Sequence, residues 1–95
     1  MTLQELRTRR KEILDVCARH GGFNVRVFGS VARGDAREDS DIDLLVELEK
    51  GRSLLDRSHL ILDLEALLGR HVDALSPRGI PPYLQDEILG QAIPL

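Results

Sequence analysis

The sequence contains few of the residues on which nucleic-acid-binding or disulfide-stabilised proteins rely. It has no tryptophan, only 3% aromatic residues and a net charge of −3, so it offers neither stacking platforms nor a basic surface for a long polyanion. Cys17 is the only cysteine, which excludes an internal disulfide, and no cysteine–histidine cluster has the spacing of a zinc site. We therefore expect small molecules or proteins as partners, and not long nucleic acid.

Long apolar runs are also missing. No apolar segment approaches the roughly 20 residues of a membrane helix, and the opening residues MTLQELRTRRKE lack the apolar core of a signal peptide. We therefore expect a cytoplasmic protein with no membrane association. A length of 95 residues, with 42% hydrophobic and 31% charged residues, predicts a single domain over residues 1–95 with one thin core.

The succession of helical and strand patterns predicts an α/β (α+β) fold. Thr2 and Glu5 have the spacing of a capping box, which places a helix start near Leu3. The expected elements are a helix from Leu3 to the Gly21–Gly22 pair, a strand over residues 23–29, one or two helical turns over 30–34, a strand over 41–48, a helix over 54–68, a strand over 71–76 and a helix over 83–93. We expect a small mixed sheet of about three strands with helices packed on it.

Apolar spacing predicts which side chains face the core. In the strand DIDLLVEL, side chains alternate between the two faces. The alternate apolar side chains from Ile42 to Leu48 point inward, and Asp41, Asp43, Leu45 and Glu47 lie on the opposite face. The strand therefore has one face on the core. The side chains expected to face inward are Ile42, Leu44, Val46 and Leu48 in this strand, Leu60, Leu64, Leu67 and Leu68 in the helix that follows, and Leu84, Ile88 and Leu89 in the last helix.

Asp41 and Asp43 are candidate ligands for a small cation. On a strand they share a face and lie roughly 6.6 Å apart, so both carboxylates can reach one Mg²⁺ ion, which prefers oxygen ligands. Asp73, in the middle of the strand-like HVDAL, can supply a third carboxylate, because an acid there sits poorly in a core unless it is paired or metal-bound. The alternative is structural: Asp41 opens the strand through a turn and Asp43 faces water.

Gly29 and Ser30 lie where a strand meets a helical turn, a position suited to an anion. Glycine lets a ligand approach the backbone closely, and the serine hydroxyl can donate to a phosphate oxygen. Arg33, one turn further on, can reach the same anion. A simple helix cap after a turn explains the Gly-Ser pair equally well, and Arg33 alone is typical of a solvated side chain. Neither G-x-x-x-x-G-K-[ST] nor G-x-G-x-x-G occurs.

The segment VFGSVARGDAREDSDIDLLVE combines these features as G-S-x10-D-x-D, with VDAL on a later strand. In this pattern, and in the order of its helices and strands, the chain resembles the nucleotidyltransferase superfamily that includes DNA polymerase β, and more closely the minimal nucleotidyltransferases (MNT). The resemblance implies that Gly29 and Ser30 hold the triphosphate of a nucleotide. It also implies that Asp41, Asp43 and Asp73 bind Mg²⁺, as two ions, and that Asp73 helps to activate the attacking hydroxyl.

The resemblance also implies a biological role. MNT proteins are commonly antitoxins of two-gene toxin–antitoxin pairs, in which AMP from ATP is transferred to a tyrosine of a HEPN-domain ribonuclease toxin. Two other functions stay open: an antitoxin that masks its partner by binding alone, and a nucleotidyltransferase acting on a small hydroxylated molecule.

Overall fold

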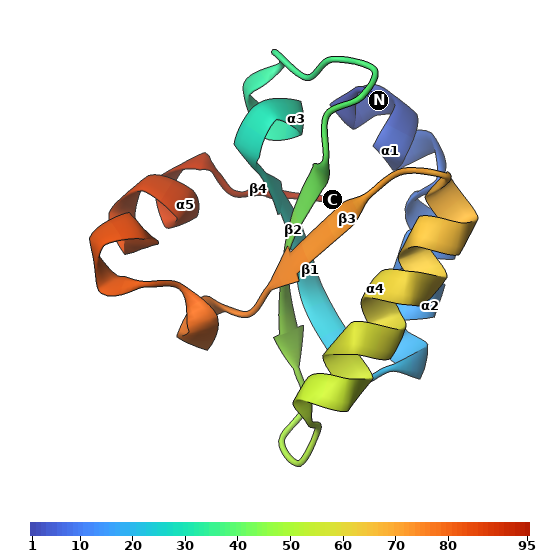
Figure 1. Cartoon of the computed structure of the whole chain (residues 1–95), viewed down its shortest axis with the longest axis vertical. Coiled ribbons are helices and arrows are strands. Elements are labelled where there is room, and N and C mark those ends of the chain that lie inside the picture. Colours follow the sequence, from blue (N-terminus) through green and yellow to red (C-terminus); the bar gives the residue numbers. More distant parts are fainter.

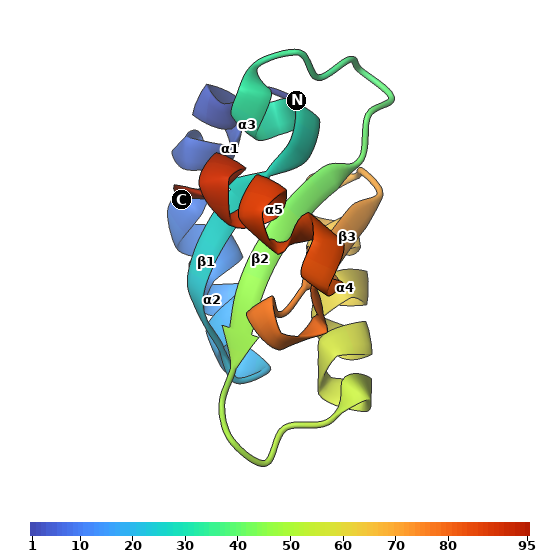
Figure 2. The ribbon, with the colours of Figure 1, turned by 90° about the vertical axis from the view of Figure 1, so that its left-hand side faces the viewer.

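A computed structural model describes all 95 residues as a four-stranded sheet with helices on both faces (Figure 1). Helices α2 and α4 lie side by side on one face, and α5 lies on the other (Figures 1 and 2). None of the helices is both long and apolar enough to cross a membrane. The elements are α1 (Leu3–Thr8), α2 (Arg10–Arg19), β1 (Gly22–Phe28), α3 (Gly29–Arg33), β2 (Ile42–Leu48), α4 (Leu54–Leu68), β3 (Val72–Leu75), the 3-10 turns η1 (Pro77–Gly79) and η2 (Pro82–Leu84), α5 (Gln85–Gln91) and β4 (Ile93–Pro94).

The sheet is mixed, as predicted, but has four strands where about three were expected. The strand order is β3-β2-β1-β4. Strand β1 pairs antiparallel with both β2 and β4, whereas β2 and β3 are parallel. A parallel pair needs a long crossover connection, and α4 supplies it between β2 and β3. The predicted fold class is confirmed.

The N-terminal helix is interrupted at Arg9, where the sequence predicts one continuous helix. Its start is as predicted, because the Thr2 hydroxyl accepts a hydrogen bond from the Glu5 amide at 3.1 Å. Arg9 leaves the helical conformation, with φ −108° and ψ 17°, and its guanidinium donates to the Leu67 carbonyl at 2.9 Å. That bond joins the interruption to α4, and local apolar spacing carries no information about such a distant contact.

Strand β2 is covered on both faces, which corrects the prediction of a single core face. Its predicted inward side chains do lie in or against the larger core, which α2 and α4 close. Leu45, assigned to the open face, is completely buried in a second cluster with Phe28, Ile80 and Ile88. The second cluster forms because the chain after β3 folds back over the sheet (Figure 2).

The C-terminal segment differs most from its prediction. Helix α5 starts at Gln85, after a 3-10 turn, and ends at Gln91, so it is shorter than the helix expected over 83–93. Ile88 is buried as predicted, but Leu89 is 45% exposed, so its expected inward orientation is wrong. A seven-residue helix has room for only a narrow buried stripe.

The last three residues form the fourth strand and its extension instead of a helix end. Ile93 pairs with Val27 of β1, and the Leu95 amide donates to the Val25 carbonyl at 3.1 Å. Pro94 has no amide hydrogen to donate, which restricts it to an edge strand, the position that β4 occupies. Two residues are too few to produce an alternating pattern, so β4 leaves no recognisable sequence signal.

Cys17 is a packing residue of the larger core. Burial raises the pKa of its thiol to about 11, so the thiol stays protonated at neutral pH. Since the thiolate is the reactive form, nucleophilic chemistry at this position is excluded.

The start of α4 yields a test of stability. The Ser53 hydroxyl accepts from the Leu55 amide at 3.2 Å, and the Asp56 carboxylate accepts from the Ser53 amide at 2.8 Å. We expect Ser53→Ala to lower the free energy of unfolding by about 1 kcal/mol, measured by urea denaturation. Ser58→Ala is the matched control, because the Ser58 hydroxyl only donates to the Leu54 carbonyl one turn back. Equal losses in the two variants would contradict the capping role.

Candidate active site

Asp43 and Asp73 lie opposite each other on the parallel strands β2 and β3. They are partners in the ladder, and Asp41 comes two residues before Asp43, just ahead of β2. Residues two apart on extended chain share one face, so the three acids lie on the face that also carries Leu45 and α5. The tertiary structure therefore brings together the three acids that the sequence singled out.

The acids lie at the open end of this face. In Figure 2, α5 crosses the middle of β1 and β2, and the ends of these strands nearest α3 extend beyond it. Asp43 is half-buried, the Asp41 side chain is 57% exposed and Asp73 is exposed. Asp73 avoids the core because β3 is an edge strand of the sheet. A molecule from solution can reach all three carboxylates.

Asp43 is the most perturbed of the three acids. Burial raises the pKa of its carboxyl above the usual value, and the charges of Asp73 and Asp41 raise it further, while Arg33 acts in the opposite direction. These contributions place Arg33 and the two other acids within electrostatic reach of Asp43. Perturbation by burial and by like charges is typical of functional sites.

Gly29 approaches Asp43 so closely that no side chain fits between them. Its φ is +72°, a conformation that L-residues with a side chain rarely adopt, and a Cβ atom there would lie 2.2 Å from Asp43 Oδ2. Gly29 begins α3, directly after β1, and Ser30 follows it in the first turn, half-buried. The Gly-Ser pair and Asp43, which are distant in sequence, are therefore neighbours in space.

Arg33 connects α3 to α5. Its side chain is 47% exposed; Nε donates to Asp35 Oδ2 at 3.3 Å, and Nη1 donates to Gln91 Oε1 at 3.4 Å. The sequence singled out Arg33 but carried no signal for Gln91, which lies 58 residues further along the chain.

His71 and Glu65 lie beside the acids on the side of β3. The His71 ring, 71% exposed, has Nδ1 3.6 Å from Asp41 Oδ1 and Nε2 3.8 Å from Glu65 Oε2. Glu65 Oε2 also accepts a hydrogen bond from the Val72 amide at 3.0 Å, which fixes the start of β3. Sequence analysis did not single out Glu65, because a lone acid near a helix end has no distinctive spacing.

The donor atoms at this site fit a hard cation such as Mg²⁺. All three are carboxylates, and Mg²⁺ commonly takes one or two carboxylates together with water and substrate phosphates. As the side chains stand, no three acidic, histidine or cysteine groups converge closely enough to enclose an ion by themselves. Asp43 and Asp73, as ladder partners, form the natural pair, and the Asp41 carboxylate lies near His71.

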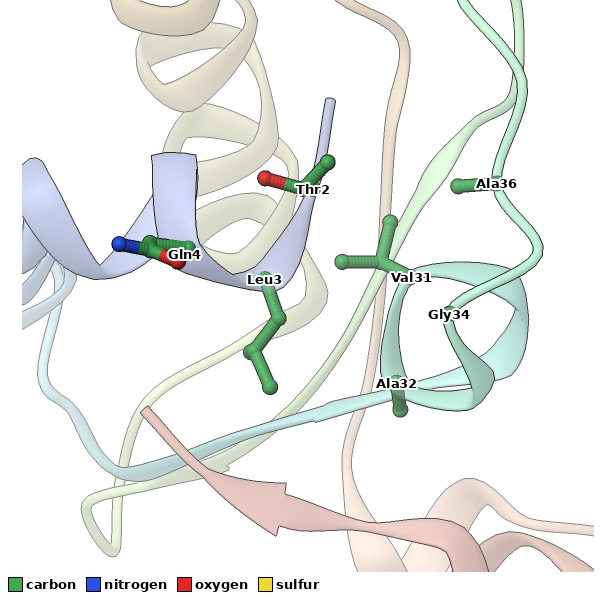
Figure 3. Close-up of a pocket in the computed structure, with 7 residues that line it drawn as sticks. All are labelled: Thr2, Leu3, Gln4, Val31, Ala32, Gly34 and Ala36. Carbon is green, nitrogen blue, oxygen red and sulfur yellow. The ribbon is translucent and has the colours of Figure 1, made fainter.

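Neither of the two cavities contains the acids. The smaller, about 250 Å³, lies between the start of α1 and the α3 region, where Leu3, Val31, Ala32 and Ala36 form a mostly apolar lining (Figure 3). The larger, about 590 Å³, lies by the turn between β2 and α4, the end of β2 farther from the acids. The candidate site is therefore an open surface edge and not an enclosed pocket.

The nucleotidyltransferase domain model matches residues 9–95 of the chain. The protein adenylyltransferase MntA of Thermococcus cleftensis is 36% identical over 97 residues, which cover 98% of this chain and 95% of the relative. A Methanocaldococcus jannaschii protein, provisionally named a protein adenylyltransferase, is 43% identical over 84 residues, or 88% of this chain and 90% of the relative.

Solved structures agree with this assignment. One described provisionally as a minimal nucleotidyltransferase is 60% identical, with a TM-score of 0.87 over 100% of this chain and 97% of the other. A toxin–antitoxin structure with AMP-PNP has a TM-score of 0.76 over 88% of this chain and 69% of the other; at 22% identity it shares the fold. The chain therefore belongs to the nucleotidyltransferase domain family and is an enzyme of that family, in the minimal group that its sequence resembles.

Proposed function

We propose that residues 1–95 form a single minimal nucleotidyltransferase domain that transfers AMP from ATP to a hydroxyl of another protein. One observation carries the proposal: the Asp43 carboxylate lies against Gly29, where a Cβ atom would collide with it, and opposite Asp73 in the ladder. A phosphate-binding turn and a cation-binding pair of acids then adjoin each other, as transfer of a metal-bound nucleotide requires.

The proposed roles follow from position and chemistry. Gly29 and Ser30 bind the triphosphate, because the glycine leaves the backbone open and the serine hydroxyl donates. Arg33, held by Asp35 and Gln91, balances negative charge beside Asp43. Asp41, Asp43 and Asp73 would hold Mg²⁺, as two ions, and Mg²⁺ would supply charge neutralisation on the phosphates. We assign Asp73, the acid on the edge strand β3, to accept the proton of the attacking hydroxyl.

The open site favours a macromolecular acceptor. A small hydroxylated acceptor needs an enclosing pocket, and neither cavity includes the acids. The relatives named protein adenylyltransferases support a protein acceptor. The toxin–antitoxin structure of the same fold supports a toxin partner. We propose a HEPN-domain ribonuclease toxin whose tyrosine receives the AMP, which makes this chain an antitoxin.

The test is labelling of the partner. The chain, Mg²⁺, labelled ATP and a HEPN-domain toxin are expected to give AMP on a toxin tyrosine, identified by mass spectrometry. Asp41→Asn is expected to abolish the label, because it removes a carboxylate beside Asp43. Asp39→Asn is the matched control: it makes the same charge change at an exposed loop position two residues away and is expected to label normally.

Each other result selects another function. Full protection of cells from the toxin by Asp41→Asn, without labelling, would replace catalysis by masking. Transfer to a small hydroxylated compound in place of the toxin would replace the protein acceptor. Equal labelling by Asp41→Asn and Asp39→Asn would overturn the assigned site.

A further inference from the structure

Tyr83 is the only tyrosine of the chain and the most exposed of its large apolar side chains. Its exposed fraction is 83%, and it lies in η2, outside the proposed site. We propose that it is itself an acceptor: one copy of the chain adenylylates Tyr83 of a second copy. This inference rests on the proposed function and extends it to a substrate that the chain carries with it.

The Tyr83 backbone is held in a defined turn. Pro81 and Pro82 precede it, and the Leu84 amide donates to the Pro81 carbonyl at 2.9 Å. Proline fixes φ, so the turn loses little conformational freedom when it is bound. The phenol therefore projects from a preorganised support into solvent, which is what an acceptor for an open site requires.

The position of Tyr83 disfavours reaction within one copy. Helix α5 has seven residues, so it is about 10 Å long. Its last residue, Gln91, contacts Arg33 of the proposed site, whereas Tyr83 precedes its first residue. In Figures 1 and 2 the orange-red segment before α5 lies well away from α3. Tyr83 thus lies about a helix length from Arg33 of its own copy, which favours transfer to a second copy.

The open edge that carries the proposed site permits this encounter. Because the acids lie outside the cavities, the phenol can approach without any opening motion.

The reaction is the proposed transfer with the acceptor changed. The Tyr83 oxygen attacks the α-phosphorus of ATP, an oxygen–phosphorus bond forms, and the bond from that phosphorus to the pyrophosphate oxygen breaks. Pyrophosphate leaves, and the phenol proton passes to Asp73 and then to water. The products are O-adenylyl-Tyr83 and pyrophosphate, and no oxidant or further reactant is needed.

The test separates donor and acceptor copies. Tyr83→Phe retains the proposed site but cannot be labelled at this position, and Asp43→Asn retains Tyr83 but lacks a carboxylate of that site. With Mg²⁺ and labelled ATP, each variant alone is expected to remain unlabelled. Their mixture is expected to carry AMP on Tyr83 of the Asp43→Asn chain, located by peptide mass spectrometry. In the wild-type chain, labelling per copy is expected to rise in proportion to protein concentration.

The failures are distinguishable. If Tyr83→Phe labels the toxin normally while Tyr83 stays unmodified in the mixture, this inference is overturned and the proposed function stands. If neither toxin nor Tyr83 is labelled by any active chain, the proposed function fails as well. Labelling per copy that is independent of concentration would overturn transfer between copies.

Discussion

Gly29→Ala is expected to destabilise the chain and abolish nucleotide transfer, whereas Gly34→Ala is expected to cost only backbone strain. Both glycines have positive φ, +72° and +84°. An L-residue in this region costs roughly 1–2 kcal/mol. At Gly29 the new Cβ atom would also lie 2.2 Å from Asp43 Oδ2, whereas at Gly34 it would meet nothing within 4 Å.

At Gly29, the clash of the new Cβ atom with Asp43 lowers stability further, in addition to the backbone strain. Either α3 moves away from β2 or the Asp43 carboxylate rotates, and overpacking of this kind typically costs about 1–3 kcal/mol. Both movements separate the proposed phosphate-binding turn from the acids. We therefore expect the free energy of unfolding to fall by roughly 2–5 kcal/mol at Gly29, against about 1–2 kcal/mol at Gly34.

Urea denaturation measures the loss of stability in each variant, and the rate of AMP transfer measures the loss of activity. Gly34→Ala is expected to remain active at temperatures where it is folded. If the two variants lose the same stability and activity, strain alone explains both, and the contact between Gly29 and Asp43 has no special role.

Asp43→Asn is expected to abolish transfer while leaving the chain as stable as wild type or more stable. Asp43 is half-buried between Asp41 and Asp73, and burial together with these charges raises the pKa of its carboxyl. The ionised form is therefore unfavourable in the folded chain. A neutral amide of the same shape removes that repulsion but binds cations poorly. Removing a hydrogen-bond partner of a metal ligand typically lowers metal affinity or activity by about 10–100-fold. Removing a ligand itself is therefore expected to lower the rate of transfer by at least about 100-fold.

The pH dependence of stability predicts independently that Asp43→Asn is more stable than wild type. Between the ordinary pKa of an aspartic acid and the raised pKa of Asp43, the folded chain binds more protons than the unfolded chain. The contribution of Asp43 to stability is therefore present at low pH and is lost as pH rises through that window. Asp43→Asn should lack this loss, so its stability advantage over wild type should grow across the window and then level off.

Thermal unfolding across that pH range, compared with Asp39→Asn, measures this effect. Asp39 is exposed in the loop, and its replacement is expected to change neither stability nor activity. A clear loss of stability in Asp43→Asn would show that the carboxylate stabilises the fold, contrary to the repulsion that we infer.

Local regularities made several features predictable from the sequence. The Thr2–Glu5 spacing located the first helix start, and alternation along DIDLLVEL identified the strand and placed Asp41 and Asp43 on one face. These patterns depend on neighbours within one turn or one strand, so the chain itself carries the information. The G-S-x10-D-x-D spacing likewise selected the residues that gather at one end of the sheet.

The break at Arg9 and the short strand β4 had no local signal, because each depends on a contact distant in sequence: Arg9 with Leu67, and Ile93 with Val27. Leu45 is buried for the same reason, since the chain after β3 returns to cover it.

The sequence by itself determined the fold class, the main strands and the candidate acids, since periodicity and spacing are properties of neighbouring residues. Only the tertiary structure decided what surrounds those acids. The ladder set Asp73 opposite Asp43, close packing set Gly29 against the same carboxylate, and Gln91 reached Arg33 from the last helix. It also left the acids on an open edge and Tyr83 far from it, because strand order and the path of the chain, not local pattern, determine which surfaces remain exposed.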